Sequence, residues 1–314
     1  MSEKRPKTIN GSSRERPIYH IPLDTDVIFV ADLFSEDLTG GAELTTEALL
    51  STAPGLSVFK LHSSHLTRAL VEKNKNRLWV LCNWSAASQE ALAALVTEGC
   101  RFFCVEYDYK YCKFRSSHLH LMQTSTPCNC HLGKNFAVAL YQRAAHVFFM
   151  SERQRREYVT LFPKMKDWNN TSVLSSVWTE QDLQTLIDLA SKHKQKNGKW
   201  AVLSGGSWIK NQTYVEEYCK DKGLPYELIG GLPYREFLEK LAQYHGLVVI
   251  PAGFDTCPRL VVEAKLLGLQ LELGDNVQHK DEAWFKDVST DVTLDYLRSS
   301  TNRFWEQILT KKEV

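Results

Sequence analysis

Two successive series of β-rich and helical segments constrain the fold of this sequence more than any other feature. Short runs rich in Val, Ile, Phe and Trp alternate with segments that have the apolar spacing of helices. The β-rich runs of the first series are residues 27–30, 57–60, 78–82, 101–105, 147–150 and 172–177, and those of the second are residues 200–203, 226–229, 247–250 and 269–271. This alternation predicts an α/β fold with two parallel sheets covered by helices.

A charged linker separates the two series and divides the chain into domains. Its sequence, Lys-His-Lys-Gln-Lys-Asn-Gly at residues 192–198, lacks the apolar positions of a packed element. With 314 residues, 43% of them apolar, the chain is long enough to fill two cores. We predict a first domain over residues 1–190, which begins with a flexible lead-in up to about Thr25. A second domain follows over residues 191–292, and a final helix over residues 293–314.

The charge balance and the apolar pattern exclude several classes of protein. Lys plus Arg number 38 and Asp plus Glu number 37, so a polyanion would have to bind to a local patch rather than to a global positive field. No apolar run approaches the roughly 20 residues of a membrane span, and the N-terminus lacks the apolar core of a signal peptide. We therefore expect a cytoplasmic protein in which the eight cysteines are reduced.

The segment after the third β-rich run of the second series carries the strongest sign of a binding site. Pro258 fits the first position of a helix, with Thr256 or Cys257 as its cap. The free amides of that first turn and the helix dipole would then form an anion site at the carboxyl end of a strand. Asp255 lies just before these amides, and Glu263 lies about one and a half turns into the helix. Two carboxylates beside a phosphate site indicate a sugar-nucleotide ligand.

This segment resembles the signature of retaining glycosyltransferases of family four, in which seven residues separate an acid from Glu-Ala. Asp255 and Glu263 fit that spacing, with Asp in place of the usual first Glu. The resemblance implies the GT-B fold, in which two Rossmann-like domains enclose a cleft and a C-terminal helix returns to the first domain. It also implies that Asp255 binds the transferred sugar and that Glu263 binds the ribose. The residues implied to hold the diphosphate between them are Thr256, Cys257, Arg259 and Leu260.

A glycine turn after the first predicted strand is a second candidate for donor binding. Thr-Gly-Gly-Ala-Glu at residues 39–43 opens a helix, and glycines allow a backbone to approach a ligand closely. The alternative interpretation is a turn with a helix cap. The string resembles the family-four loop that closes over the donor, and this resemblance implies donor contacts by Gly40, Gly41 and Glu43. A dinucleotide fingerprint needs G-x-G-x-x-G, so these glycines do not indicate hydride chemistry.

Lys210 is the main candidate for a cation that stabilises a departing diphosphate. It follows the first predicted strand of the second domain, and the family commonly has an Arg five residues earlier, where this chain has Gly205. Arg259 is a candidate substitute, and the alternative for it is an ion pair with Glu263 on a helix surface. Gly230 lies where the family holds the nucleobase against backbone, and a plain turn is the alternative there.

Aromatic and basic residues interleave after the fourth strand of the first domain. The candidates for acceptor binding in this stretch are Tyr107, Tyr109, Lys110, Lys113 and Arg115. Cations can hold phosphates while rings stack on bases or sugars, and the alternative is that the rings pack against the sheet while the cations are solvated. Asp108 and His118 or His120 are candidates to orient or deprotonate an acceptor hydroxyl. Glu106 with Asp108 could mimic the metal-binding acids of GT-A enzymes, but the phosphate site makes that metal unnecessary.

Three cysteines and a histidine raise the alternative of a zinc site. The residues are Cys112, Cys128, Cys130 and His131. Their spacing, C-x15-C-x-C-H, is not one of the regular zinc-ligand spacings, so we favour buried reduced thiols. We therefore expect no metal, and no cofactor besides the nucleotide-sugar donor.

Together these features predict a metal-independent, retaining glycosyltransferase that moves a hexose from UDP-glucose to a hydroxyl. Asp255, Lys210, Asp108 and His118 are the predicted catalytic residues. The chain also resembles soluble glycosyltransferases of phages and bacteria, some of which modify DNA, which implies the host cytoplasm for a phage protein. The first candidate acceptor is a 5-hydroxymethylpyrimidine, such as 5-hydroxymethylcytosine, in double-stranded DNA. The alternatives are a surface-polysaccharide precursor or small molecule as acceptor, and a protein that binds sugar nucleotides without catalysis.

Overall fold

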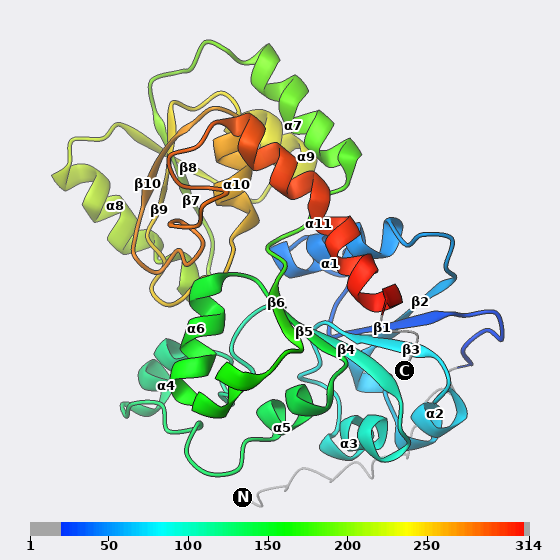
Figure 1. Ribbon diagram of the computed structural model, residues 1–314. Helices are drawn as coiled ribbons and strands as arrows, with labels where there is room; N and C mark the ends of the chain where they lie inside the picture. Colours follow the sequence, from blue (N-terminus) through cyan, green and yellow to red (C-terminus); the bar gives the residue numbers. More distant parts are fainter. Residues whose placement is uncertain (1–19, 311–314) are drawn as a thin grey trace, which may run out of the picture.

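The computed structural model describes residues 20–310, and these form two α/β domains, each built on a parallel sheet (Figure 1). Residues 1–19 of the lead-in that was predicted up to Thr25 lie outside the described residues. Within the described residues, no helix is long and apolar enough to cross a membrane.

The first domain contains a sheet with the strand order β2-β1-β3-β4-β5-β6, in which every pair of neighbours is parallel. The strands are β1 (Val27–Ala31), β2 (Val58–His62), β3 (Leu78–Leu81), β4 (Arg101–Glu106), β5 (His146–Phe149) and β6 (Thr171–Val173). The helices are α1 (Gly41–Ser51), α2 (Arg68–Lys73), α3 (Gln89–Thr97), α4 (Ser117–Thr124), α5 (Phe136–Arg143) and α6 (Glu152–Leu161), with 3-10 helices at Ser63–His65 and Pro163–Asp167. The strands were predictable because parallel strands are buried on both faces and are therefore apolar throughout.

The second domain contains a parallel sheet with the order β10-β9-β7-β8. Its strands are β7 (Trp200–Leu203), β8 (Tyr226–Ile229), β9 (Gly246–Val249) and β10 (Gln270–Leu273). Its helices are α7 (Glu180–Lys192), α8 (Gln212–Asp221), α9 (Tyr234–Leu241) and α10 (Arg259–Leu266), with a 3-10 helix at Trp208–Lys210. Each strand of the second domain lies within two residues of its predicted range, and the two-sheet α/β architecture is confirmed.

The crossing between the domains begins earlier than the linker at residues 192–198. The run 172–177 was predicted as one strand, but β6 ends at Val173. The next residues leave the sheet and bond to the second domain, as when Ser176 Oγ donates to Cys257 O at 2.7 Å. Helix α7 then packs against α9 and α10, so residues 180–190, which we assigned to the first domain, pack with the second.

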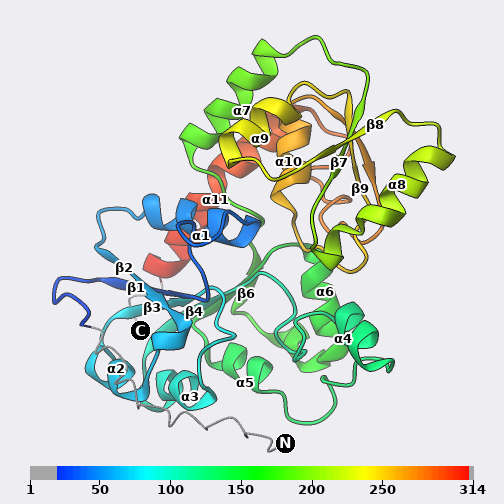
Figure 2. The same cartoon turned by 180° about the vertical axis from the view of Figure 1, so that it is seen from behind.

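The C-terminal helix α11 (Thr290–Thr310) runs from the second domain back to the first, where it lies beside α1 (Figures 1 and 2). Trp305 Nε1 donates to Leu49 O at 3.1 Å, and Arg101 donates to Ile308 O at 2.8 Å. The Phe304 ring is fully buried and lies 4.9 Å from that of Phe148. The predicted return of this helix is confirmed, and its apolar face joins the two domains.

Candidate active site

A cavity of about 620 Å³ lies between the two domains, and we call it the interdomain cavity. This volume falls in the range of small-molecule sites, about 300–1,000 Å³. Thirteen of the predicted site residues line it: Gly40, Gly41, Tyr107, Asp108, Arg115, Lys210, Gly230, Asp255, Thr256, Cys257, Arg259, Leu260 and Glu263. Five others do not: Glu43, Tyr109, Lys110, Lys113 and His118. The fold thus brings segments of both domains, far apart in the sequence, to one hollow.

Helix α10 begins at the wall of this cavity, as predicted, although its cap differs from the expected one. Pro258 is the N-cap itself, and within the described part of the chain no side chain caps the helix. Thr256 Oγ1 instead donates to Tyr107 O at 2.8 Å, and Cys257 O accepts from Ser176. Thr256 and Cys257 therefore tie the loop to the first domain. The amides of Arg259 and Leu260 at the start of α10 have no intrahelical acceptors and remain for a ligand.

Glu263 is 2% exposed, and it lines the cavity beyond the start of α10. Its Oε1 accepts from Trp178 Nε1 at 3.2 Å and from Tyr234 Oη at 2.5 Å. Arg259 Nε lies 3.4 Å from the same oxygen. All three contacts hold Oε1, so the carboxylate is oriented before any ligand arrives.

Arg259 forms the i, i+4 ion pair that we considered as an alternative, but the pair is buried rather than on a helix surface. Its side chain is 4% exposed, and its guanidinium carbon lies 4.2 Å from the centre of the Trp178 ring. It also donates to Val177 O in the crossing between the domains. Arg259 is therefore fixed in place at the cavity wall by cation–π, ionic and backbone contacts.

Asp255 and Lys210 face each other across a gap of 3.9 Å between Oδ2 and Nζ. Both side chains line the cavity, and they are 20% and 33% exposed. Burial raises the pKa of Asp255, and the positive charge of Lys210 offsets part of that effect. The pair therefore combines an acid whose charged form is destabilised by burial with a cation that is only loosely held.

The glycine turn lies on the opposite wall, where Gly40 is the N-cap of α1 and Gly41 its first residue. A Cβ atom on Gly40 would lie 2.3 Å from Glu43 Oε2, so a side chain does not fit there without moving Glu43. Glu43 does not line the cavity, and burial raises its pKa. The predicted glycine contacts thus face the cavity, whereas Glu43 lies behind them.

The basic and aromatic stretch is largely buried, which corrects two predicted acceptor contacts. Tyr109 is 3% exposed, and its hydroxyl donates to Gln278 Oε1 at 2.8 Å. The Lys110 side chain is also 3% exposed, with Nζ 3.3 Å from both Glu106 and Asp108. The rings pack inside the domain, as the alternative interpretation had it, but Lys110 is buried in an ion cluster rather than solvated.

Arg115 organises the charged wall of the cavity on the first-domain side. Its guanidinium forms an ion pair with Asp108 and lies 3.3 Å from Asp32 Oδ2. It donates to Asn83 Oδ1 at 2.8 Å and to Ser85 Oγ at 2.9 Å. Burial alone would raise the pKa of Asp108, but Lys110 and Arg115 outweigh it and lower that pKa. Asp108 is therefore a weak base that holds Arg115.

His118 and Lys113 lie outside the cavity lining. The His118 ring packs edge-on against the Phe254 ring at 5.0 Å, and burial lowers its pKa. Phe254 lines the cavity, so His118 supports the wall from behind. Lys113 is exposed, with its ammonium 4.9 Å from the centre of the Phe114 ring.

Three residues of the site had no place in the sequence predictions: Asp32, Trp178 and Tyr234. Asp32 directly follows β1, so its position at a strand end could have marked it, and Tyr234 opens α9 after the Gly-Gly-Leu-Pro turn. Trp178 lies in the crossing between the domains, and only the packing of that segment on α10 brings it to Glu263.

No family model matches the sequence, and no curated protein matches it. Among solved structures, the fold resembles Anabaena Alr3699/HepE, described in complex with UDP, at a TM-score of 0.54 and 13% identity over 91% of this chain and 100% of that chain. It also resembles AviGT4, a glycosyltransferase involved in avilamycin A biosynthesis, at a TM-score of 0.50 and 12% identity over 90% and 96%. A third similar structure is a trehalose-6-phosphate synthase, at a TM-score of 0.50 and 8% identity over 91% of this chain and 96% of that chain. The chain therefore has the GT-B fold of these glycosyltransferases, as the sequence predicted.

Proposed function

We propose that this protein is a retaining glycosyltransferase that transfers glucose from UDP-glucose to a hydroxyl acceptor. The observation that carries the proposal is the meeting of the α10 amides, Lys210, Asp255 and Glu263 around one cavity. A phosphate site flanked by two carboxylates suits a nucleotide sugar. Similar folds crystallised with UDP, such as Anabaena Alr3699/HepE, support this choice of nucleotide.

The diphosphate binds at the first turn of α10. Amides of Arg259 and Leu260 have no intrahelical acceptor there, and the positive end of the helix dipole favours an anion. Lys210 adds a full charge as the sugar–phosphate bond breaks and the negative charge on the leaving group grows. Arg259 binds the diphosphate through its backbone amide and not through its guanidinium, because the guanidinium is already held by Glu263, Trp178 and Val177.

The nucleoside binds deeper in the cavity, at Glu263. Oε1 of this carboxylate is held by protein donors, so Oε2 accepts from the ribose hydroxyls. Gly230 lines the same wall and presents backbone to the base. Asp255, on the other side of the diphosphate, accepts from the hydroxyls of the transferred sugar.

The acceptor oxygen attacks the anomeric carbon on the face from which UDP leaves, as the family resemblance implies. The new glycosidic C–O bond forms as the bond to the diphosphate breaks. The acceptor proton passes to the released diphosphate, because the lowered pKa of Asp108 makes it a poor proton acceptor. Asp108 has a positioning role through Arg115.

UDP binding is the first test. Isothermal titration should show that wild type binds UDP and that Lys210→Ala binds it about tenfold or more weakly, since a charged contact contributes about 1.5–3 kcal/mol. Lys220→Ala, which removes an exposed lysine from α8, is the matched control and should bind as wild type does. Equal affinity of all three proteins would contradict the assigned diphosphate site.

The acceptor is the finer part of the proposal, and we place a 5-hydroxymethylpyrimidine in DNA first. Exposed Lys113 with Phe114, next to the cavity wall, supports contact with a phosphate and a base. UDP-glucose should be incubated with hydroxymethylcytosine DNA, with unmodified DNA and with polysaccharide precursors, and the products weighed by mass spectrometry. Transfer of glucose to the modified DNA alone would support DNA as the acceptor. Transfer to a polysaccharide precursor would show that the acceptor is a saccharide and not DNA. Intact UDP-glucose in every reaction, with no slow hydrolysis even in the absence of acceptor, would favour a binding protein without catalysis.

A further inference from the structure

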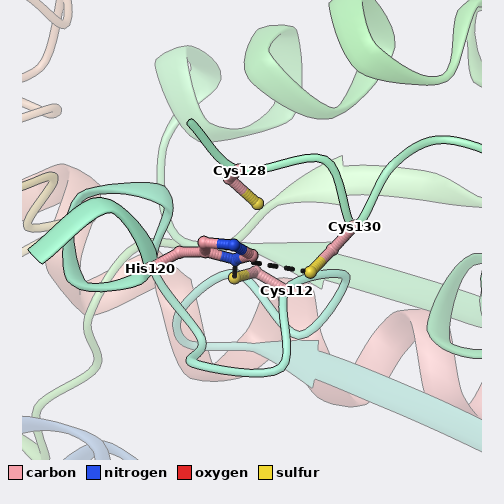
Figure 3. Close-up of side chains that lie close together, drawn as sticks. All are labelled: Cys112, His120, Cys128 and Cys130. Atoms are coloured by element: carbon pink, nitrogen blue, oxygen red, sulfur yellow. Dashed lines mark hydrogen bonds between the residues drawn. The ribbon is translucent and has the colours of Figure 1, made fainter. Parts of the chain in front are cut away.

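A cluster of three cysteines and one histidine lies apart from the interdomain cavity. Cys112, His120, Cys128 and Cys130 direct their side chains toward one point (Figure 3). One ligand atom from each lies within 4.8 Å of all the others. Cys112 and His120 are buried, and the other two are partly buried. All of the protein's cysteines are free thiols in this structure.

Two sulfur–nitrogen distances in the cluster match the edges of a zinc tetrahedron. Zn–S bonds of about 2.3 Å and Zn–N bonds of about 2.0–2.1 Å at tetrahedral angles give S···N edges of about 3.6 Å and S···S edges of about 3.8 Å. His120 Nδ1 lies 3.5 Å from Cys112 Sγ and 3.5 Å from Cys130 Sγ. The imidazole nitrogen that faces the sulfurs is therefore already at ligand spacing.

The histidine of this cluster is His120, and not His131 as the linear spacing had suggested. Helix α4 carries His120 in its first turn. Ser116 caps that helix by accepting from Leu119 N, and the helix directs the His120 ring inward beside the Phe114 ring at 5.2 Å. The resulting spacing, C-x7-H-x7-C-x-C, brings together ligands from α4 and from the loops before and after it.

We propose that Cys112, His120, Cys128 and Cys130 bind one structural zinc ion. Four protein ligands of the Cys3His type complete a tetrahedron and leave no position for a substrate or water, which is typical of structural zinc and not of catalytic zinc. Binding displaces the thiol protons into solution. The expectation of no metal, drawn from the spacing with His131, is replaced by this proposal.

The site joins segments that have little regular structure of their own. Asn135 Nδ2 donates to Tyr111 O and to Cys130 O, both at 2.9 Å, so the backbones that carry two of the ligands are already linked. Phe114, Arg115, Ser116 and Leu119 lie between the first two ligands in the sequence and line the interdomain cavity. Zinc therefore holds the first-domain wall of that cavity in shape, whatever ligand the cavity takes.

Metal analysis of the full chain tests the proposal without any donor or acceptor. Protein produced in zinc-supplemented medium and dialysed should contain one zinc per chain by mass spectrometry of the elements. Cys112→Ser and Cys128→Ser should lose that zinc. Cys219→Ser, in a buried cysteine of α8, and His131→Asn are the matched controls and should keep it. Loss of zinc in His131→Asn with retention in a His120→Asn variant would overturn the assigned ligand set.

Cobalt substitution gives a second readout that does not depend on variants that fold poorly. Wild-type protein stripped of metal and given Co²⁺ should show the visible d–d bands of tetrahedral cobalt and sulfur-to-cobalt charge transfer. A chelator should release the zinc and lower the Tm of the wild-type protein. Wild type that takes up neither zinc nor cobalt would overturn the proposal, as would mass spectrometry of peptides that shows a disulfide among Cys112, Cys128 and Cys130 in freshly isolated protein.

Discussion

Lys210 Nζ lies 3.9 Å from Asp255 Oδ2 at the wall of the interdomain cavity, and burial raises the pKa of that carboxyl while Lys210 opposes the shift. A raised pKa means that the folded state binds the proton more tightly than the unfolded state. Stability is therefore lost as the pH rises from the ordinary value of 3.8 through the folded pKa of Asp255. At neutral pH the ionised Asp255 therefore lowers the stability of the folded protein, as is expected for a carboxylate whose role is to bind a ligand.

Asp255→Asn should raise the Tm at pH 7 and lower transferase activity. The amide removes the cost of a buried charge, and the gain in Tm should shrink as the pH falls through the folded pKa of Asp255 and the wild-type carboxyl becomes protonated. If Asp255 binds the transferred sugar, kcat/KM with UDP-glucose should fall by about 100-fold. Thermal denaturation across this pH range, with initial rates at pH 7, measures both effects. A variant less stable than wild type at neutral pH would contradict the expected sign of the stability change.

Glu263→Gln should weaken both stability and UDP binding, for different reasons. The amide oxygen can still accept from Trp178 and Tyr234, but Arg259 is left as a buried cation without its partner, at a cost of about 3–5 kcal/mol in the free energy of unfolding. Loss of the charged acceptor for the ribose should weaken UDP binding by about 10- to 100-fold. Chemical denaturation and isothermal titration give the two values.

The double variant Arg259→Met with Glu263→Gln separates these two effects. Removing both charges of a buried pair is often close to neutral, so stability should largely return. UDP affinity should stay low, because the carboxylate is still absent. Glu236→Gln, on the exposed face of α9, is the control for the loss of one negative charge. Recovery of UDP affinity in the double variant would show that Glu263 acts only through folding.

Gly230→Ala should perturb the wall assigned to the nucleobase. A Cβ atom there would lie 2.5 Å from Ser204 Oγ and 2.7 Å from Ser204 O, and the backbone oxygen cannot rotate away. We expect a loss of about 1–3 kcal/mol in unfolding free energy and weaker UDP binding. Gly206→Ala is the matched control, since its Cβ would meet nothing within 4 Å. Equal effects of the two substitutions would argue against close contact at residue 230.

Lys110→Met should destabilise the first domain in a pH-dependent way. Burial raises the pKa of Glu106 above its ordinary value, and the positive charge of Lys110 opposes part of that shift. Removing Lys110 therefore raises the pKa of Glu106 further. The folded state then resists ionisation of Glu106, and stability falls as the pH rises through the folded pKa. A loss of about 3–5 kcal/mol is expected, growing toward alkaline pH. Lys113→Met, which removes an exposed charge, should change stability by less than about 0.5 kcal/mol and serves as the control in urea denaturation.

Local composition was enough to find the sheets and the start of α10. Val27 and its neighbours in β1 are fully buried because parallel strands are covered on both faces, so their apolar character is visible in the sequence. Pro258 and the flanking acids likewise marked α10 by signals that depend on only a few adjacent residues.

The same reasoning failed where burial depends on distant segments. Tyr109 and Lys110 have the composition of an exposed binding surface, but Gln278 from the second domain and Glu106 at the end of β4 enclose them. The turn of α4 that brings His120 to Cys112 is equally invisible as a linear spacing.

By itself the sequence determined the order of strands and helices, the α/β class with two parallel sheets and the two carboxylates that flank α10. Each of these follows from side chains close together in the chain. The tertiary structure alone decided which charged groups face the interdomain cavity and which are buried in ion pairs, and which histidine joins the three cysteines. Those outcomes depend on how loops from separate elements pack together, because desolvation and pairing are set by neighbours in space rather than in sequence.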